Sequence, residues 1–128
     1  MHRVVLLGLA VVFVAAACGG GGPKTYTAAK TRECLAGRGA TVGGPLDFVA
    51  STALGGAFVV HVHGNWVTVA FGKGQADAER IQQAYDKFAL PNVKAGLPDV
   101  LRRYSNAIML WHAHPSSSQL SEVADCLH

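Results

Sequence analysis

The sequence predicts an α+β domain, a two-layer sandwich in which helices cover one face of a small antiparallel sheet. Two runs, 58–63 and 66–71, are rich in β-branched and aromatic residues and flank a two-residue turn signal. Residues 75–90 have apolar side chains at helical spacing. One face of the predicted hairpin is apolar and the other is mixed, which is typical of a sheet with helices on one side only. One or two further strands are expected to complete this sheet.

The N-terminal part of the domain predicts two helices with a short strand between them. Residues 24–36 fit a helix, because apolar side chains recur at helical spacing and Gly37 ends the run. Residues 40–42 fit a short edge strand. Residues 45–54 have a mixed pattern that fits a short helix with Pro45 in its first turn.

Gly64 and Asn65 predict the turn of the hairpin, because this pair suits a type I′ or II′ turn. The turn fixes the register of the two strands. The predicted cross-strand pairs are His63 with Trp66, Val62 with Val67, His61 with Thr68, Val60 with Val69 and Phe58 with Phe71. The apolar face then consists of Phe58, Val60, Val62, Val67, Val69 and Phe71. The mixed face consists of Val59, His61, His63, Trp66, Thr68 and Ala70.

The C-terminal half predicts two longer helices and one more strand. Residues 75–90 form an amphipathic helix, which Pro91 ends because its ring bars continuation. Residues 98–104 fit a further helical turn. Residues 107–113 are predicted to form a strand, and 116–127 form the last helix, with a capping-box pattern at its start.

The first 18 residues have the composition of an export signal. Residues 1–3 are weakly basic, 4–17 are apolar and uncharged, and small residues precede Cys18. The apolar run is shorter than the roughly 20 residues that a membrane-spanning helix needs. This pattern resembles the lipobox signal of bacterial lipoproteins.

The resemblance implies cleavage before Cys18 and attachment of a diacylglyceryl lipid to its thiol. It divides the chain into a signal peptide (1–17), a lipidated glycine-rich tether (18–24) and a single α+β domain (25–128). It places the domain at the outer face of the bacterial cytoplasmic membrane, or at the periplasmic membrane face of a Gram-negative cell. The mature domain is also loosely similar to small actinobacterial lipoproteins, which implies export and anchoring but no activity.

The charge balance argues against nucleic-acid binding. The chain has 11 Lys and Arg against 8 Asp and Glu, a formal net charge of +3, and loss of Arg3 with the signal leaves +2. Nucleic-acid-binding domains carry denser basic patches than this. Besides the membrane, the expected partner is therefore an envelope protein or a small ligand.

Cys34 and Cys126 are predicted to form a disulfide. The lipoprotein resemblance places them in an oxidising compartment, where disulfides persist. A bridge between them closes a loop of roughly 90 residues and is expected to stabilise the domain by about 4 kcal/mol. The alternative is a redox pair, which usually uses the Cys-x-x-Cys spacing that this chain lacks.

The sequence gives little support to catalysis, and we expect no enzymatic activity. The chain has no Gly-x-Ser-x-Gly elbow and no His-Glu-x-x-His helix. Its acidic residues fall mostly at helix ends or on polar helix faces, where a carboxylate pair would not meet a substrate. Gly72-Lys73-Gly74 lacks the third glycine of a dinucleotide fingerprint, because that position is Asp77, and we interpret it as a strand-to-helix turn.

Four histidines form two pairs with strand spacing, His61 with His63 and His112 with His114. Residues i and i+2 of a strand project from the same face, so each pair can offer two imidazoles to one ion. Four imidazoles, or three with a water molecule, would suit zinc or copper. A metal-binding lipoprotein is therefore the alternative hypothesis for function.

Whether the two histidine pairs meet depends on which residues of the last strand face the core. If Met109 and Trp111 do, all four imidazoles share the open face of the sheet. If Ile108 and Leu110 do, the pairs lie on opposite faces. The two alternatives have similar hydrophobicity, so both stay open.

The leading hypothesis is a non-enzymatic envelope module that binds its partner through the open face of the sheet. Trp66 and Thr68 are the candidate residues, because they lie on the mixed face of the hairpin. Apolar surface left open on such a face often marks a binding site. The alternative is that residues 45–54 or 93–104 cover this face.

Overall fold

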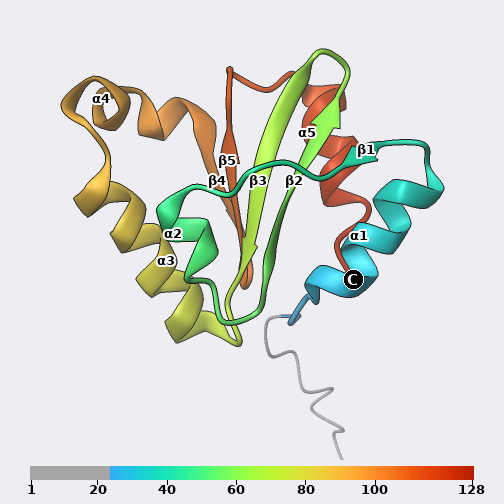
Figure 1. Cartoon of the computed structure of the whole chain (residues 1–128), viewed down its shortest axis with the longest axis horizontal. Coiled ribbons are helices and arrows are strands. Elements are labelled where there is room, and N and C mark those ends of the chain that lie inside the picture. Colours follow the sequence, from blue (N-terminus) through green and yellow to red (C-terminus); the bar gives the residue numbers. More distant parts are fainter. Residues whose placement is uncertain (1–23) are drawn as a thin grey trace, which may run out of the picture.

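The computed structural model describes residues 24–128, so the predicted signal peptide, the lipidation site at Cys18 and residues 18–23 of the tether lie outside the described residues. The strands form a central sheet, and the helices lie around it (Figure 1). In chain order they are α1 (Ala28–Gly37), β1 (Thr41–Val42), α2 (Phe48–Ser51), β2 (Ala57–Val62), β3 (Asn65–Phe71), α3 (Gln75–Phe88), α4 (Pro91–Val100), β4 (Leu101–Tyr104), β5 (Ala107–Trp111) and α5 (Ser117–Ala124). None of the helices in residues 24–128 is long and apolar enough to cross a membrane.

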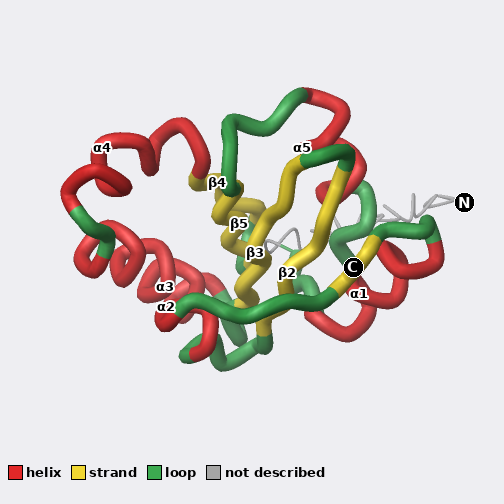
Figure 2. Tube along the Cα trace, turned by 45° about the horizontal axis from the view of Figure 1, so that its top comes forward, coloured by secondary structure: helices red, strands yellow, loops and turns green. Residues whose placement is uncertain are grey.

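The sheet has five strands in the order β1-β2-β3-β5-β4, and every neighbouring pair is antiparallel. β3 is the central strand, paired with β2 on one side and with β5 on the other (Figure 2). The predicted α+β class and the antiparallel hairpin are therefore confirmed. The further strands are β1, β4 and β5, one more than expected.

Helices cover both faces of the sheet, which corrects the predicted two-layer arrangement. α1 and α5 lie against one face, and α2, α3 and α4 lie on the other side (Figure 1). The first face carries the larger core, which includes the six predicted apolar residues of the hairpin. The second core forms because Ala70 and Ile108 make part of the other face apolar, and Ala78 and Ile81 of α3 pack there. The two-layer prediction was wrong in leaving that face uncovered, whereas its alternative, in which residues 45–54 or 93–104 cover the face, agrees with the positions of α2 and α4.

The hairpin turn lies one residue earlier than predicted. His63 and Gly64 occupy the turn with φ angles of 47° and 79°, and Asn65 is the first residue of β3. His61 therefore pairs with Trp66, and Val62 pairs with Asn65. The side chain of Asn65 holds the backbone of Ala113, a role that requires its place in the strand. Each residue of β3 therefore pairs two residues earlier in β2 than predicted. Because side chains alternate between the faces of a strand, a shift of two leaves the predicted apolar face unchanged.

The segment after α3 also differs from the prediction. Pro91 both prevents continuation of α3 and occupies the first turn of α4, a position that suits proline. α4 ends at Val100, and residues 101–104 form strand β4 instead of a helical turn. β4 pairs with β5, with Leu101 opposite Leu110. The pairing supplied by β5 overrides the weak local helical pattern.

The predicted disulfide joins Cys34 of α1 to Cys126, which follows α5. The two Cα atoms are 5.4 Å apart, and the cysteines are separated by 92 residues in the chain. Cys126 is fully buried, and it belongs to the larger core together with Val123 and Leu127. The bridge therefore fastens the first helix to the end of the chain on one face of the sheet.

Replacing Gly72 with alanine should lower the free energy of unfolding by about 2 kcal/mol, because a Cβ there has no room. It would lie 2.5 Å from the backbone nitrogen of Ala78 in α3. Urea unfolding of Gly72→Ala measures the loss. Gly74→Ser is the matched control, because a Cβ at Gly74 meets nothing within 4 Å and serine suits the cap of α3. Equal stability of the two variants would contradict the expected clash.

Candidate functional site

Trp66 marks the candidate site, on the face of the sheet that α4 overhangs. Its side chain is 39% exposed, a large fraction for an indole on a central strand. Its ring stacks on the imidazole of His112, with centroids 3.4 Å apart and planes 13° from parallel. The ring of His61, opposite Trp66 on β2, lies 6.1 Å away. The indole is thus held between two imidazoles.

Hollows lie on both sides of Trp66. The larger has a volume of about 410 Å³ and lies between the sheet and α4. The smaller has a volume of about 260 Å³ and lies toward the segment that follows β1. The larger is lined by Trp66, Thr68, Asn92, Val93, Gly96, Asp99, Val100, Leu110, Trp111 and His112. The smaller is lined by Gly44, Pro45, Val59, His61, Trp66 and Thr68.

Thr68 lies between Trp66 and the second core, and its position corrects the predicted exposed pair. It is only 8% exposed, so it is not a surface residue. It nevertheless lines both hollows, which makes it part of their shared floor. The candidate binding face is therefore a recess with Trp66 at its rim, and not the open surface that the leading hypothesis assumed.

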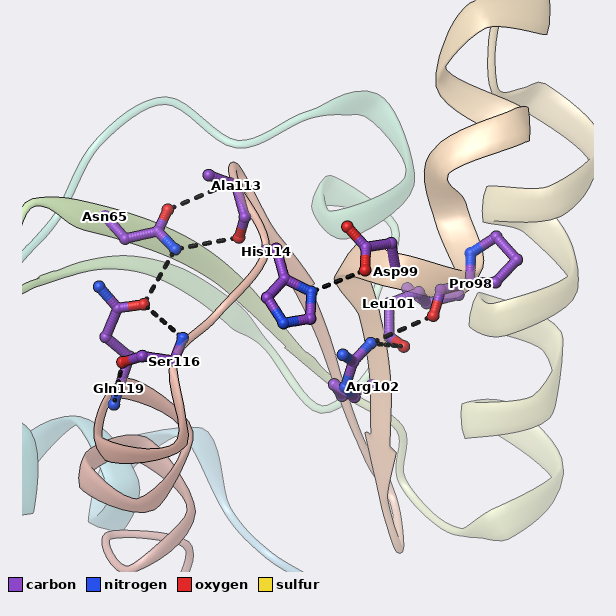
Figure 3. A network of polar contacts seen from close by, with 9 residues as sticks. All are labelled: Asn65, Pro98, Asp99, Leu101, Arg102, Ala113, His114, Ser116 and Gln119. Carbon is purple, nitrogen blue, oxygen red and sulfur yellow. Dashed lines mark hydrogen bonds and ion pairs between the residues drawn. The ribbon is translucent and has the colours of Figure 1, made fainter.

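A network around Asn65 fixes the strand ends that carry Trp66 and His112 (Figure 3). The Asn65 side chain donates to the carbonyl of Ala113 at 3.0 Å and accepts from its amide at 3.1 Å. It also donates to Oε1 of Gln119, and the same oxygen accepts from the amide of Ser116. The sequence analysis missed this role, although the capping-box residue Gln119 was a signal that this corner is ordered.

Asp99 borders the larger hollow from α4 and is engaged by His114. Nδ1 of His114 lies 2.6 Å from Oδ1 of Asp99 (Figure 3). This contact joins the end of α4 to the segment that follows β5. His114 is thus engaged by Asp99 and not by His112.

The structure does not bring the four histidines together. Met109 and Trp111 face the larger core, which was the alternative that allowed a shared face. However, His63 occupies the turn and contacts Glu122 of α5, while His114 contacts Asp99. Only His61 and His112 remain beside Trp66. Within residues 24–128, no group of three or more His, Cys, Asp or Glu side chains could hold a metal ion.

A row of exposed apolar side chains borders the larger hollow on the side of α2 and α3. We call it the apolar ridge and define it as Phe48, Phe88, Leu90 and Val93, which are 72%, 58%, 67% and 42% exposed. The Phe48 and Phe88 rings meet edge to face, 6.1 Å apart. Helical spacing places Phe88 on the same side of α3 as the buried Ile81 and Tyr85, yet its side chain is exposed. Phe88 contacts Phe48 instead and lines a hollow with Leu97 and Leu110.

Tyr85 and Asp47 fix the base of the ridge. The Tyr85 hydroxyl donates to Asp47 at 2.9 Å, and the other carboxylate oxygen of Asp47 accepts from the amide of Ala50 at the start of α2. Burial, with the nearby charge and hydrogen bond of Asp47, raises the pKa of the Tyr85 phenol above its usual range. The phenol therefore stays neutral and acts as a structural donor between α2 and α3.

Neither a family model, a curated protein nor a solved structure matches this chain. Its function is therefore inferred from the geometry of the face around Trp66.

Proposed function

We propose that the protein is a lipid-anchored binding module of the bacterial cell envelope, which takes an envelope protein or a small ligand at the recess beside Trp66. The module acts by binding and not by catalysis. The observation that carries the proposal is the exposed indole of Trp66 between two hollows, on a sheet face that helices otherwise cover. Tryptophan is enriched among the residues that dominate binding energy, because it offers a large apolar face and one hydrogen-bond donor.

The contacts that hold the side chains around the recess favour ligand binding over catalysis. Trp66 is stacked on His112, and Asn65 ties the ends of their strands together, so the recess is preformed. The Asp99 carboxylate at its border is engaged by His114. A preformed recess costs little ordering entropy when a partner binds.

The lipid anchor is argued from the sequence and from the pairing of the other two cysteines. Residues 4–17 are apolar, small residues precede Cys18, and Cys34 and Cys126 are already paired with each other. Cys18 is therefore the cysteine left for acylation. Two acyl chains on it would hold the module stably at the membrane surface.

Site-specific photocrosslinking in cells tests the proposal. A photoreactive residue at position 93, on the rim of the recess, should give a discrete crosslinked species. Trp66→Ala should abolish that species, because it removes the indole that the partner contacts. Mass spectrometry of the same preparations reports whether Cys18 carries lipid, and Cys18→Ala should release the protein from the membrane fraction.

The control is the same photoreactive residue at position 32, on the exposed side of α1. α1 packs on the opposite face of the sheet from α4, so position 32 should not give the species. The same species from both positions, or its persistence in Trp66→Ala, would rule out the recess as the binding site.

A further inference from the structure

The apolar ridge adjoins the recess, with which it shares Val93, and it has no covering element among residues 24–128. Its residues come from the start of α2, the end of α3 and the start of α4, which meet on one side of the domain (Figure 1). Phe48, Phe88 and Val93 line a common hollow of about 260 Å³. Scattered apolar side chains are normal on a protein surface, whereas a gathered group marks an interaction site.

Two lysines flank the ridge. The Lys87 ammonium lies 5.4 Å from the centre of the Phe88 ring, and Lys94 follows Val93 on α4. Lysine side chains beside apolar residues can extend their charge toward lipid headgroups while their stems stay in apolar surroundings. Of the nearby carboxylates, Asp47 is engaged by Tyr85, and Asp86 lines a flanking hollow with Lys94. The patch thus combines exposed apolar side chains with lysines at their edge, which suits the interface of a bilayer.

The reach of the N-terminal segment is compatible with such a contact. Six residue steps separate Cys18 from Lys24, so their Cα atoms can be at most about 20 Å apart. The carbonyl of Lys24 accepts from Ser105, whose hydroxyl also contacts Gln75 at the start of α3. α3 has 14 residues and is therefore about 21 Å long, with Phe88 at its far end. A domain lying with α3 along the membrane can keep Cys18 at the bilayer and the ridge against it.

We propose that the apolar ridge docks on the lipid bilayer as a second contact, beside the acyl chains on Cys18. This inference rests on the anchoring part of the proposed function. Anchoring keeps the ridge at a high effective concentration near the membrane, so even a weak contact is populated. Val93 belongs to the ridge and also lines the larger hollow. Docking of the ridge would therefore hold the recess beside Trp66 close to the bilayer surface.

Fluorescence quenching by brominated lipids tests this docking. The full-length gene is expressed in a bacterial host, and the processed protein is reconstituted into vesicles of phosphatidylcholine and phosphatidylglycerol with brominated acyl chains. Leu90→Trp reports on the ridge, and Arg32→Trp on the opposite face is its matched control, both in a Trp66→Phe background. Trp111 is 2% exposed and common to both. We expect emission at position 90 to fall by about half, because apolar side chains of a surface-bound element enter the acyl boundary, and emission at position 32 to stay constant.

Equal quenching at the two positions would overturn the docking. So would a blue shift at position 90 that rises with protein density but is insensitive to bromine, because it would show that the ridge pairs with a second copy. Mass spectrometry of the same sample tests the anchor separately. If Cys18 is not acylated, its free thiol is coupled to a maleimide lipid and the quenching is repeated. Failure of the natural anchor is thereby distinguished from failure of the ridge to dock.

Discussion

Removing the Cys34–Cys126 disulfide should lower the free energy of unfolding by about 4 kcal/mol, because the bridge closes a long loop in the unfolded chain. The two cysteines are 92 residues apart, so the bridge restricts almost the whole domain when the chain is unfolded. Reduction removes that restriction and raises the conformational entropy of the unfolded chain. In the folded state, the bridge ties α1 to the end of the chain against the larger core. Urea unfolding of the Cys34→Ala/Cys126→Ala variant, compared with the oxidised protein, measures this loss.

Two comparisons isolate the contribution of the bridge. Unfolding of the unaltered protein in the presence of a reductant should show a similar loss, because it opens the same loop without changing the side chains. Ser118→Ala, on the exposed side of α5, should change the stability by less than about 0.5 kcal/mol. If the double variant stays within about 1 kcal/mol of the oxidised protein, loop closure is not what stabilises this fold.

Local patterns in the sequence predicted the elements that depend on near neighbours. The alternation in β2 and β3 identified the apolar face of the hairpin, which is now the centre of the larger core. The error in the turn did not affect it, because the pairing shifts by two residues and an even shift preserves the side on which every side chain lies. The capping box of Ser116 and Gln119 likewise predicted the start of the last helix.

The coverage of the second face could not be predicted from any single segment. It depends on β5, whose residues Ile108 and Met109 are equally apolar and give no preferred orientation from sequence alone. Pairing with β3 decides the orientation, because Val69 lies opposite Met109. Ile108 and Ala70 then create an apolar floor on the other side, on which α2 and α3 pack.

The candidate site was predicted in part. Trp66 was expected on the mixed face, and it lies there with an exposed indole. Residues 93–104 were one alternative for covering this face, but the recess was not predicted, because its outer wall is α4 and only a helical turn over 98–104 was expected there. The apolar ridge was also missed, since helical spacing places Phe88 in line with Ile81 and Tyr85 and cannot show that its side chain, unlike theirs, is left exposed.

Replacing Asn106 with alanine should lower the free energy of unfolding by about 3 kcal/mol, because three hydrogen bonds of a buried amide are lost together. Asn106 is fully buried at the turn between β4 and β5. Its side chain accepts from the amide of Tyr26 at 2.7 Å and donates to the carbonyls of Tyr26 and Gly72, both at 2.8 Å. Urea unfolding measures the loss. Asn92→Ala, an exposed asparagine on α4, is the control and should be nearly neutral.

The choice of replacement separates lost hydrogen bonds from lost volume. Asn106→Asp keeps the size of the side chain but sets an acceptor against the carbonyls of Tyr26 and Gly72, so it should destabilise the domain at least as much as alanine. If aspartate were tolerated, the amide donors would not be what holds this junction. Because Tyr26 lies two residues after Lys24, Asn106 is also the residue that fixes where the chain enters the domain. Its loss should therefore also loosen the attachment of residues 24–26 to the rest of the domain.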